Sequence, residues 1–262
     1  MYNLNRILFR KIIQWIFLIV SLILIFLLIQ GTLKVAHQYC PYASVCFGVM
    51  GLNPTFGKFI YPTAVIIGLV ILVLTIFVGR KFCGYVCPLG TIQEIIYLLN
   101  PRSKKPKLHD LPKPLHRILL IFKYIFFLIT VIAAYGIFQY GYMKFCPVLA
   151  ISHPQHLKVA GIISLFIVFI VAFFLERFWC RYACPYAALM NIFQWFGKIL
   201  HIPRTKIIRN MEVCIDCYIC DKNCPMQINI CDKEIIDDVE CIHCNKCMEK
   251  CPRPKSLDIK SL

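Results

Sequence analysis

Negative charge is scarce in most of this 262-residue chain. Residues 1–203 contain only three acidic side chains, Glu94, Asp110 and Glu176, beside 19 Lys and Arg residues. Residues 204–262 contain ten residues of each sign, so the net charge of +16 comes entirely from the first part. A basic excess can indicate nucleic-acid binding. Here it is confined to a strongly apolar segment, which indicates membrane topology and excludes nucleic acid as the expected partner.

Charged residues are also few overall, at 16% against 59% hydrophobic residues, so the expected solvent is lipid. Four apolar runs are long enough to cross a bilayer, at about residues 12–33, 59–78, 118–138 and 159–178. They are expected to be helices, because lipid offers no partner for an unpaired backbone amide. The first run lacks the small-residue exit of a cleaved signal peptide, and we expect it to be retained.

The basic residues predict the orientation of these spans. They gather before the first span and between the second and third, whereas residues 34–58 and 139–158 hold two each. Lys and Arg are retained in cytoplasmic loops. Both termini are therefore predicted to be cytoplasmic, with the two sparsely charged connections outside.

Sixteen cysteines occur mostly in tight clusters, which points to metal binding. "CIDCYICDKNCP" begins at Cys214 and "CIHCNKCMEKCP" at Cys241, and each reads Cys-x2-Cys-x2-Cys-x3-Cys-Pro. This spacing predicts two [4Fe-4S] clusters that exchange their fourth ligands. The first set is Cys214, Cys217, Cys220 and Cys251, and the second is Cys241, Cys244, Cys247 and Cys224. Zinc also binds paired cysteines, but it explains neither the third cysteine nor the Cys-Pro ending.

Residues 205–258 resemble the bacterial two-cluster ferredoxins, which implies a compact domain for one-electron transfer. Cys231 falls outside both ligand sets and is expected to be a plain buried thiol.

A second cysteine pattern occurs twice, as "CGYVCPLG" from Cys83 and "CRYACPYA" from Cys180. The alignment also matches Arg80 with Arg177, and each copy follows an even-numbered span, which indicates an internal repeat. If the second and fourth spans lie side by side, four thiols converge at their cytoplasmic ends: Cys83, Cys87, Cys180 and Cys184. They would hold a further iron–sulfur cluster, hold zinc, or work as two dithiols.

Three further cysteines, Cys40, Cys46 and Cys146, fall in the connections predicted to be outside. A disulfide and an outward redox site are equal alternatives for them. Of the acidic residues, Glu94 is expected to be a solvated helix charge, and Glu176 to form a local ion pair with Arg177.

The four spans, the two Cys-x3-Cys-Pro motifs and the terminal ferredoxin together resemble the NapH-like membrane polyferredoxins, a family related to NosR-type and CcoG-type proteins. This resemblance implies an all-α transmembrane four-helix domain in residues 1–203 and an α+β ferredoxin domain in residues 204–262. It implies a multi-pass protein of the bacterial inner membrane with a cytoplasmic ferredoxin domain.

The expected function is that of an electron-transfer subunit of an oxidoreductase, a quinol dehydrogenase that links the quinone pool to a partner redox protein of anaerobic respiration. CcoG-type relatives suggest an alternative, a redox assembly or maturation factor for a metalloenzyme.

Overall fold

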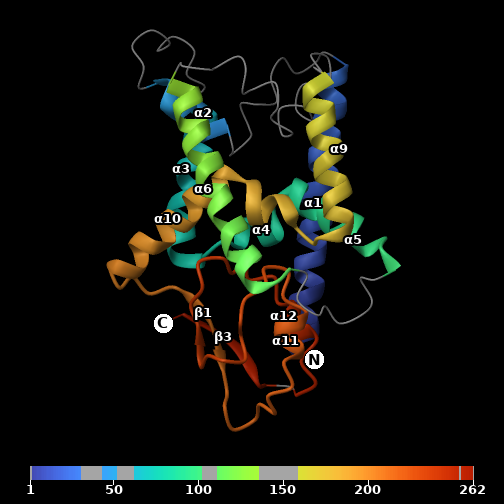
Figure 1. Cartoon of the computed structure of the whole chain (residues 1–262), viewed down its shortest axis with the longest axis vertical. Helices are drawn as coiled ribbons and strands as arrows, with labels where there is room; N and C mark the ends of the chain where they lie inside the picture. Colours follow the sequence, from blue (N-terminus) through green and yellow to red (C-terminus); the bar gives the residue numbers. More distant parts are fainter. Residues whose placement is uncertain are drawn as a thin grey trace.

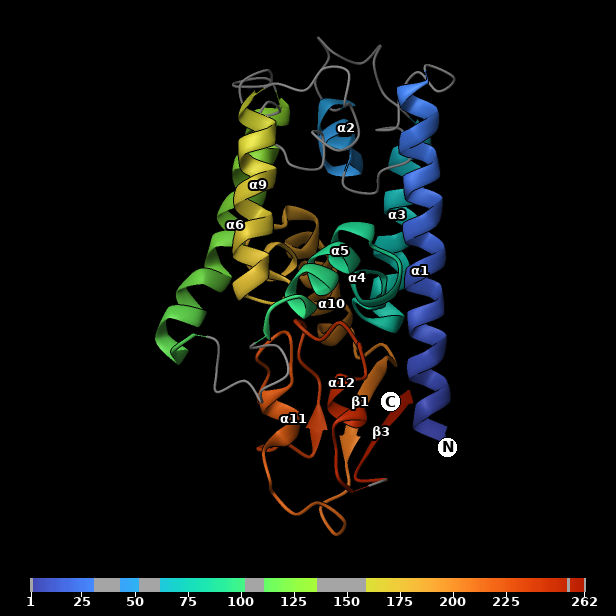
Figure 2. The ribbon, with the colours of Figure 1, turned by 90° about the vertical axis from the view of Figure 1, so that its right-hand side faces the viewer.

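The computed structural model describes residues 2–30, 43–51, 62–101, 111–135, 159–253 and 255–261. Long helices stand mainly on one side of a middle layer of short helices, and a small sheet lies on the other side, where the start of the first helix also reaches it (Figures 1 and 2). Both chain ends lie near the sheet (Figure 2). Arg6 at the start of the first helix accordingly forms an ion pair with Asp258, the last acidic residue, with 3.8 Å between Nη1 and Oδ1.

Four long helices coincide with the four expected spans: α1 (Tyr2–Ile29), α3 (Pro62–Val78), α6 (Lys113–Tyr135) and α9 (Val159–Phe174). Among the described residues, Arg6–Leu27 within α1 and Lys113–Tyr135 are long and apolar enough to cross a membrane. The apolar helices Thr63–Val78 and Val159–Phe174 are shorter.

Large apolar side chains on these helices face outward, as Trp15, Leu69, Phe122 and Phe166 show. Contiguous apolar surface of this kind is unfavourable in water and ordinary in lipid. The chain is therefore a membrane protein.

A short helix, α2 (Ala43–Gly51), lies in a connection that we expected to be a loop. It packs against α3 and α6, and Val45 and Cys46 are buried. Nine residues are too few to resemble a span, so the apolar pattern did not reveal it.

The middle layer is built from the two Cys-x3-Cys-Pro motifs. The first motif gives α4 (Lys81–Tyr85) and α5 (Pro88–Leu98), and the second gives the π-helix η5 (Trp179–Ala183) and α10 (Pro185–Ile199). In both copies the cysteine before the proline is extended at the helix N-cap, and the proline starts the next helix. Proline suits this position because its missing amide hydrogen has no helical partner there.

Each helix that follows a motif packs against a span of the other copy. The α5 helix of the first copy packs against α9 of the second, and α10 of the second copy packs against α3 of the first, as well as against α6. This packing brings the two motifs together in the middle layer.

The remaining segment forms a small α+β unit. Its sheet has the order β2-β1-β3, with β1 (Thr205–Arg209) antiparallel to β2 (Ile235–Ile236) and β3 (Leu257–Ser261). Two one-turn helices, α11 (Ile219–Lys222) and α12 (Lys246–Glu249), complete it. Of these two, α12 lies nearer to the middle layer (Figures 1 and 2).

Candidate metal centres

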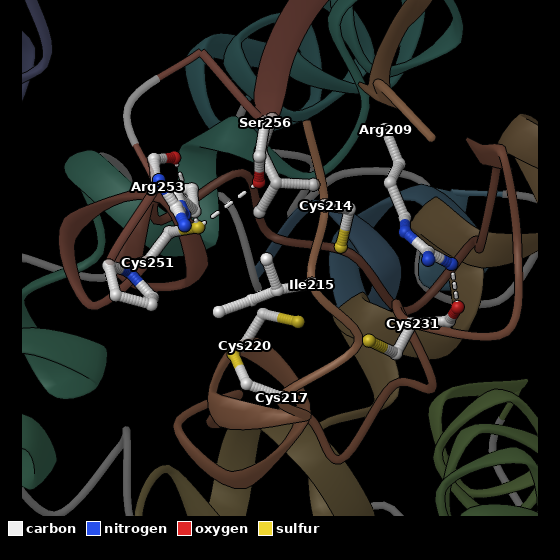
Figure 3. Close-up of a pocket in the computed structure, with 11 residues that line it drawn as sticks. Arg209, Cys214, Ile215, Cys217, Cys220, Cys231, Cys251, Arg253 and Ser256 are labelled. Atoms are coloured by element: carbon white, nitrogen blue, oxygen red, sulfur yellow. Dashed lines mark hydrogen bonds between the residues drawn. The ribbon is translucent and has the colours of Figure 1, made fainter. Parts of the chain in front are cut away.

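The four thiols of the first expected cluster surround one cavity, shown in Figure 3. The cavity contains about 340 Å³ of empty space, part of it open to solvent, and its thiol lining is Cys214, Cys217, Cys220, Cys251 and also Cys231. Cys220 and Cys231 are buried, and the other three are half-buried. Cys231 is a buried thiol, as expected, and its side chain also lines the cavity of the first ligand set.

A second cavity, of about 360 Å³ by the same measure, is lined by the other assigned set: Cys224, Cys241, Cys244 and Cys247. All four of these cysteines are buried. Met226 and Ile228 also line the cavity, so apolar side chains shield it from water. The chain thus has one thiol-lined cavity near solvent and one in its interior.

The two motifs share one backbone conformation. Asp216 and His243 stand at equivalent positions and have φ values of 50° and 49°, and Tyr218 and Asn245 have 56° and 62°. Left-handed residues between right-handed ones turn backbone N–H groups to one side, and such concavities bind anions, iron–sulfur clusters included. The crossed thiol sets and this backbone therefore fit two thiolate-ligated [4Fe-4S] clusters.

The thiols of the repeated motifs also converge. Cys83, Cys87 and Cys184 each interact electrostatically with Cys180, and a hydrogen bond joins Cys87 to Cys180. This hydrogen bond lowers the pKa of Cys180, burial opposes it, and two arginines add to the lowering. Burial raises the pKa of Cys83 and Cys184, and the hydrogen bond to Cys180 raises that of Cys87. The surroundings therefore favour a thiolate at Cys180, and the thiolate is the form that binds a metal. We call these four cysteines the membrane quartet.

Two buried arginines cross between the repeats and hold the membrane quartet together. Arg80 donates from Nη2 to the carbonyl oxygen of Cys180 at 3.0 Å, and Arg177 donates from Nη1 to that of Cys83 at 2.5 Å. Both arginines are fully buried. Since Arg80 and Arg177 are equivalent in the alignment, each repeat fixes the cysteine backbone of the other.

The exchange between repeats extends to the next helices. Arg177 donates to Glu94 at 2.6 Å, and Arg80 donates to Asn191 at 3.2 Å. Glu94 and Asn191 are again equivalent in the alignment, but only Glu94 is charged. At position 191 the second copy therefore offers no carboxylate to Arg80, the arginine of the first copy.

The residues before Glu94 and Asn191 face the thiols. Gln93 lies with Nε2 at 3.8 Å from the sulfur of Cys180, and Met190 lies with Sδ at 3.7 Å from the sulfur of Cys83. The membrane quartet is therefore surrounded in a pseudo-twofold manner, with an amide at one thiol and a thioether at the other.

The α+β unit supplies the missing carboxylate through Glu240, the residue before Cys241. Glu240 accepts hydrogen bonds from Arg80 at 2.8 Å and from Asn191 at 2.7 Å, and it forms an ion pair with Lys123. Burial acts to raise the pKa of Glu240, but Lys123 and Arg80 outweigh it and hold the pKa below its usual range. A carboxylate of the α+β unit thus balances the buried positive charges of Arg80 and Lys123 in the membrane-side part of the chain.

A second ionic contact overturns two expectations from the sequence. Glu94 is buried, not solvated, and it binds Arg10 at 2.6 Å and Lys246 at 3.1 Å in addition to Arg177. Glu176 pairs with Lys246 and not with the adjacent Arg177. Both predictions were wrong because Lys246 comes from the distant α12.

The backbones of the two kinds of motif touch at Gly84. A Cβ atom added to Gly84 would lie 2.4 Å from the carbonyl oxygen of Ile242, closer than any ordinary contact. Gly84 follows Cys83 and Ile242 follows Cys241. The second thiol-lined cavity and the membrane quartet are therefore separated by a direct backbone contact.

His243 packs beside this contact, against Gly79, whose φ of 67° and close approach to the imidazole exclude a side chain. Burial lowers the pKa of His243 to about 4, and Lys81 and Arg204 add to the lowering. The structure shows His243 as a neutral packing group of this interface.

Cys40 and Cys146 lie outside the described residues. Of the three cysteines expected on the outer side, the described part of the chain includes Cys46, which is buried in α2.

Thiol-lined cavities beside apolar, outward-facing helices define the class: a membrane-associated iron–sulfur electron-transfer protein. A family model described as "4Fe-4S binding domain" matches residues 61–106 and 157–203, which are the two copies of the repeat. Each copy holds only two cysteines of the membrane quartet, so four ligands require both copies.

Curated relatives agree with this assignment. "Uncharacterized protein MJ0750" of Methanocaldococcus jannaschii is 32% identical, over 70% of this chain and 74% of its own length. "Putative electron transport protein YccM" of Escherichia coli is 32% identical, over 76% of this chain and 56% of its own. "Regulatory protein NosR" of Stutzerimonas stutzeri is 30% identical, over 65% of this chain and 24% of its own length.

The chain therefore belongs to the family of NapH-like membrane polyferredoxins that carry a 4Fe-4S binding domain, which confirms the resemblance. It spans just over half of YccM and about a quarter of NosR. No solved structure matches it.

Proposed function

We propose that this electron-transport protein relays electrons between the quinone pool and a partner redox protein, as a subunit of a quinol dehydrogenase. In this proposal the two crossed cysteine sets hold two [4Fe-4S] clusters, and the membrane quartet holds a third. The observation that carries the proposal is the backbone contact between Gly84 and Ile242, because it joins the interior set to the membrane quartet.

Bound [4Fe-4S] clusters would accept and release single electrons. The chain's own residues supply the ligands, the burial and the charge around them. Arg80, Arg177 and Lys246 lie between the interior set and the membrane quartet, and all three act electrostatically on cysteines of these sites. Cations beside thiolate ligands stabilise the reduced, more negative state and so raise its reduction potential.

The proposed topology is a four-span domain in residues 1–203 and a ferredoxin domain in residues 204–262, with both termini on the cytoplasmic side of a bacterial inner membrane. The outward apolar faces of α1, α3, α6 and α9 support the spans. The membrane quartet follows the ends of α3 and α9, where a quinol dissolved in the lipid would reach the protein.

The alternative, an assembly or maturation factor, depends on accessible thiols on the outer side. Cys46 is buried, and Cys40 and Cys146 lie outside the described residues. No described observation favours this function over electron relay.

The test starts from protein purified without oxygen. Iron and acid-labile sulfide are measured, and cluster signals are followed by EPR during reduction with a menaquinol analogue. The double variant Cys83→Ser/Cys180→Ser should lose about one third of the iron, since three equal clusters are proposed, and should lose reduction by quinol. The signals of the other two sites should persist under dithionite.

The matched control is Cys46→Ser in α2, which changes a buried thiol that lines neither cavity and belongs to none of the proposed ligand sets. It should retain the iron content and the quinol response. A wild-type protein without iron and sulfide, or with zinc in their place, would refute the proposal. Full iron and unchanged quinol reduction in the double variant would remove the role of the membrane quartet.

A further inference from the structure

The two halves of the α+β unit are equivalent in sequence and backbone but differ in what covers them. Ile242 and Asn245 of the second motif are 1% and 3% exposed. Their counterparts in the first motif, Ile215 and Tyr218, are 53% and 45% exposed. One structural surface is therefore buried in one half and open in the other.

The middle layer covers the surface of the second motif. The carbonyl of Ile242 faces Gly84, and the side-chain amide of Asn245 donates to the hydroxyl oxygen of Tyr85 at 3.0 Å. Both Gly84 and Tyr85 belong to the "CGYVC" stretch of the membrane quartet. If the proposed function holds, this is the surface through which the second motif exchanges electrons with its neighbour.

The equivalent surface of the first motif is exposed, and further apolar side chains enlarge it. Met211 is 56% exposed and Ile235 is 44% exposed, on the segments that flank the first motif and the loop after Cys231. We call Met211, Ile215, Tyr218 and Ile235 the distal face. Of these residues, Ile215 lines the solvent-side cavity (Figure 3), and Tyr218 follows Cys217, which also lines it.

The charges along these segments are mostly negative. Four carboxylates are exposed there, Glu212, Asp216, Asp232 and Glu234, together with one lysine, Lys233. Asp216 is paired with Arg209, and the exposed Arg253 also lines the solvent-side cavity. Asp216 and Asp232 both act electrostatically on the hydroxyl of Tyr218, which places them beside the apolar centre. An apolar centre with a charged rim is the usual composition of a transient interface.

We propose that the distal face is the docking surface for a redox protein with a basic rim around its own redox group. This proposal rests on the proposed function and adds the partner's chemistry to it. Opposite charges would steer the partner onto the apolar centre, at the point where the solvent-side cavity is nearest. The partner would thus contact the first motif as the membrane quartet contacts the second.

Other occupants suit the distal face less well. The apolar helices α3 and α9 lie on the opposite side of the middle layer. The start of α1 continues along β3, whereas α11 of the first motif lies away from α1, so the first motif points away from the lipid that these helices would enter (Figure 2). Anionic headgroups would also repel the carboxylates. A second copy related by a twofold axis would place like charges against each other.

The experiment measures electron transfer from the full chain, in detergent and without oxygen, after reduction by dithionite. The probe is a basic mitochondrial cytochrome c, whose ferric haem takes one electron and becomes ferrous. The comparison probe is the same cytochrome with succinylated lysines, which is acidic. Stopped-flow absorbance at several salt concentrations gives the second-order rate constants.

The test variant is Asp232→Lys, and the matched control is Asp258→Lys on β3, at the opposite edge of the sheet from β2. Asp232→Lys should slow reduction of the basic probe about tenfold at low salt and speed reduction of the succinylated probe. Both effects should vanish at high salt. Asp258→Lys should behave as the wild type does.

A second variant, Tyr218→Asn, installs the residue of the equivalent position, which tolerates the left-handed backbone. It should slow both probes at all salt concentrations and keep the EPR signals, and it carries the test if Asp232→Lys loses its clusters.

Equal rates for all variants, or equal changes for both probes in Asp232→Lys, would overturn the docking surface and leave the proposed function intact. A wild type without reducible clusters would overturn both.

Discussion

Substitution of Gly84 by alanine tests the contact on which the electron relay depends. The new Cβ would lie 2.4 Å from the carbonyl oxygen of Ile242, and 3.5 Å from its carbonyl carbon. A carbonyl of the backbone cannot rotate away as a flexible side chain does. Either the "CIHC" loop moves by a large fraction of an ångström, or the α+β unit separates from the middle layer.

The expected cost follows from two opposing effects. Forcing an extra carbon into a packed interior costs about 1–3 kcal/mol. Gly84 lies in α4 without a positive φ, so alanine also stabilises the helix by roughly 0.5–1 kcal/mol. The clash is larger, and the net penalty of about 1–2 kcal/mol corresponds to roughly a 5- to 30-fold change in the docking equilibrium.

The matched control is Gly48→Ala in α2, where no atom lies within 4 Å of the added Cβ. Hydrogen–deuterium exchange should show faster exchange around Ile242 in Gly84→Ala and not in Gly48→Ala. The EPR signals of the two tail sites should persist under dithionite, while their reduction by a menaquinol analogue should slow. Equal exchange and equal quinol reduction in the two variants would refute the role of the backbone contact.

Two further substitutions probe the charges of the same interface. Glu240→Gln leaves the buried cations of Arg80 and Lys123 without a carboxylate, so it should lower the free energy of unfolding by about 3–5 kcal/mol. The double variant Glu240→Gln/Lys123→Met should recover part of this loss. Urea denaturation measures both variants, and an unchanged midpoint in Glu240→Gln would contradict the pairing. His243 stays neutral in the folded chain down to about pH 4, whereas the unfolded chain protonates it near its usual pKa of about 6.5. Its contribution to stability is therefore complete above pH 6.5 and is lost as the pH falls toward 4, so the urea midpoint should fall less between pH 7.5 and pH 5 in His243→Gln than in the wild type.

Features that follow from short-range chemistry could be predicted from the sequence. The proline of each Cys-x3-Cys-Pro motif breaks one helix and starts the next, and the spacing of the tail cysteines encodes the two loops that face the cavities. The sequence alignment also predicted that Arg80 and Arg177 are equivalent. In the structure each of them donates a hydrogen bond to the backbone of a cysteine in the other copy.

The polar residues near the helix ends could not be predicted in the same way. Gln14 and Lys123 lie within the first and third expected spans, where Gln14 donates to the carbonyl of Gly84 at 3.0 Å and Lys123 pairs with Glu240. Hydropathy describes a residue's preference for lipid or water. Gln14 instead contacts a residue 70 positions away, and Lys123 one 117 positions away, and no local pattern records such contacts.

The α+β unit is part of the membrane-side site and not an attachment to it. One arginine of the crossed pair, Arg177, finds its carboxylate within the repeat, at Glu94. The other, Arg80, meets the neutral Asn191 and depends on Glu240 for its counter-charge. Because an unpaired buried cation costs several kcal/mol, the second half of the repeat reaches electrostatic balance only when the segment with Glu240 is docked. The same residue precedes Cys241, so the contact that balances the charge also fixes the interior thiol set against the membrane quartet. Because residue 191 is an asparagine and not a carboxylate, Arg80 is balanced only by Glu240. Docking of the last segment and completion of the thiol site are therefore coupled.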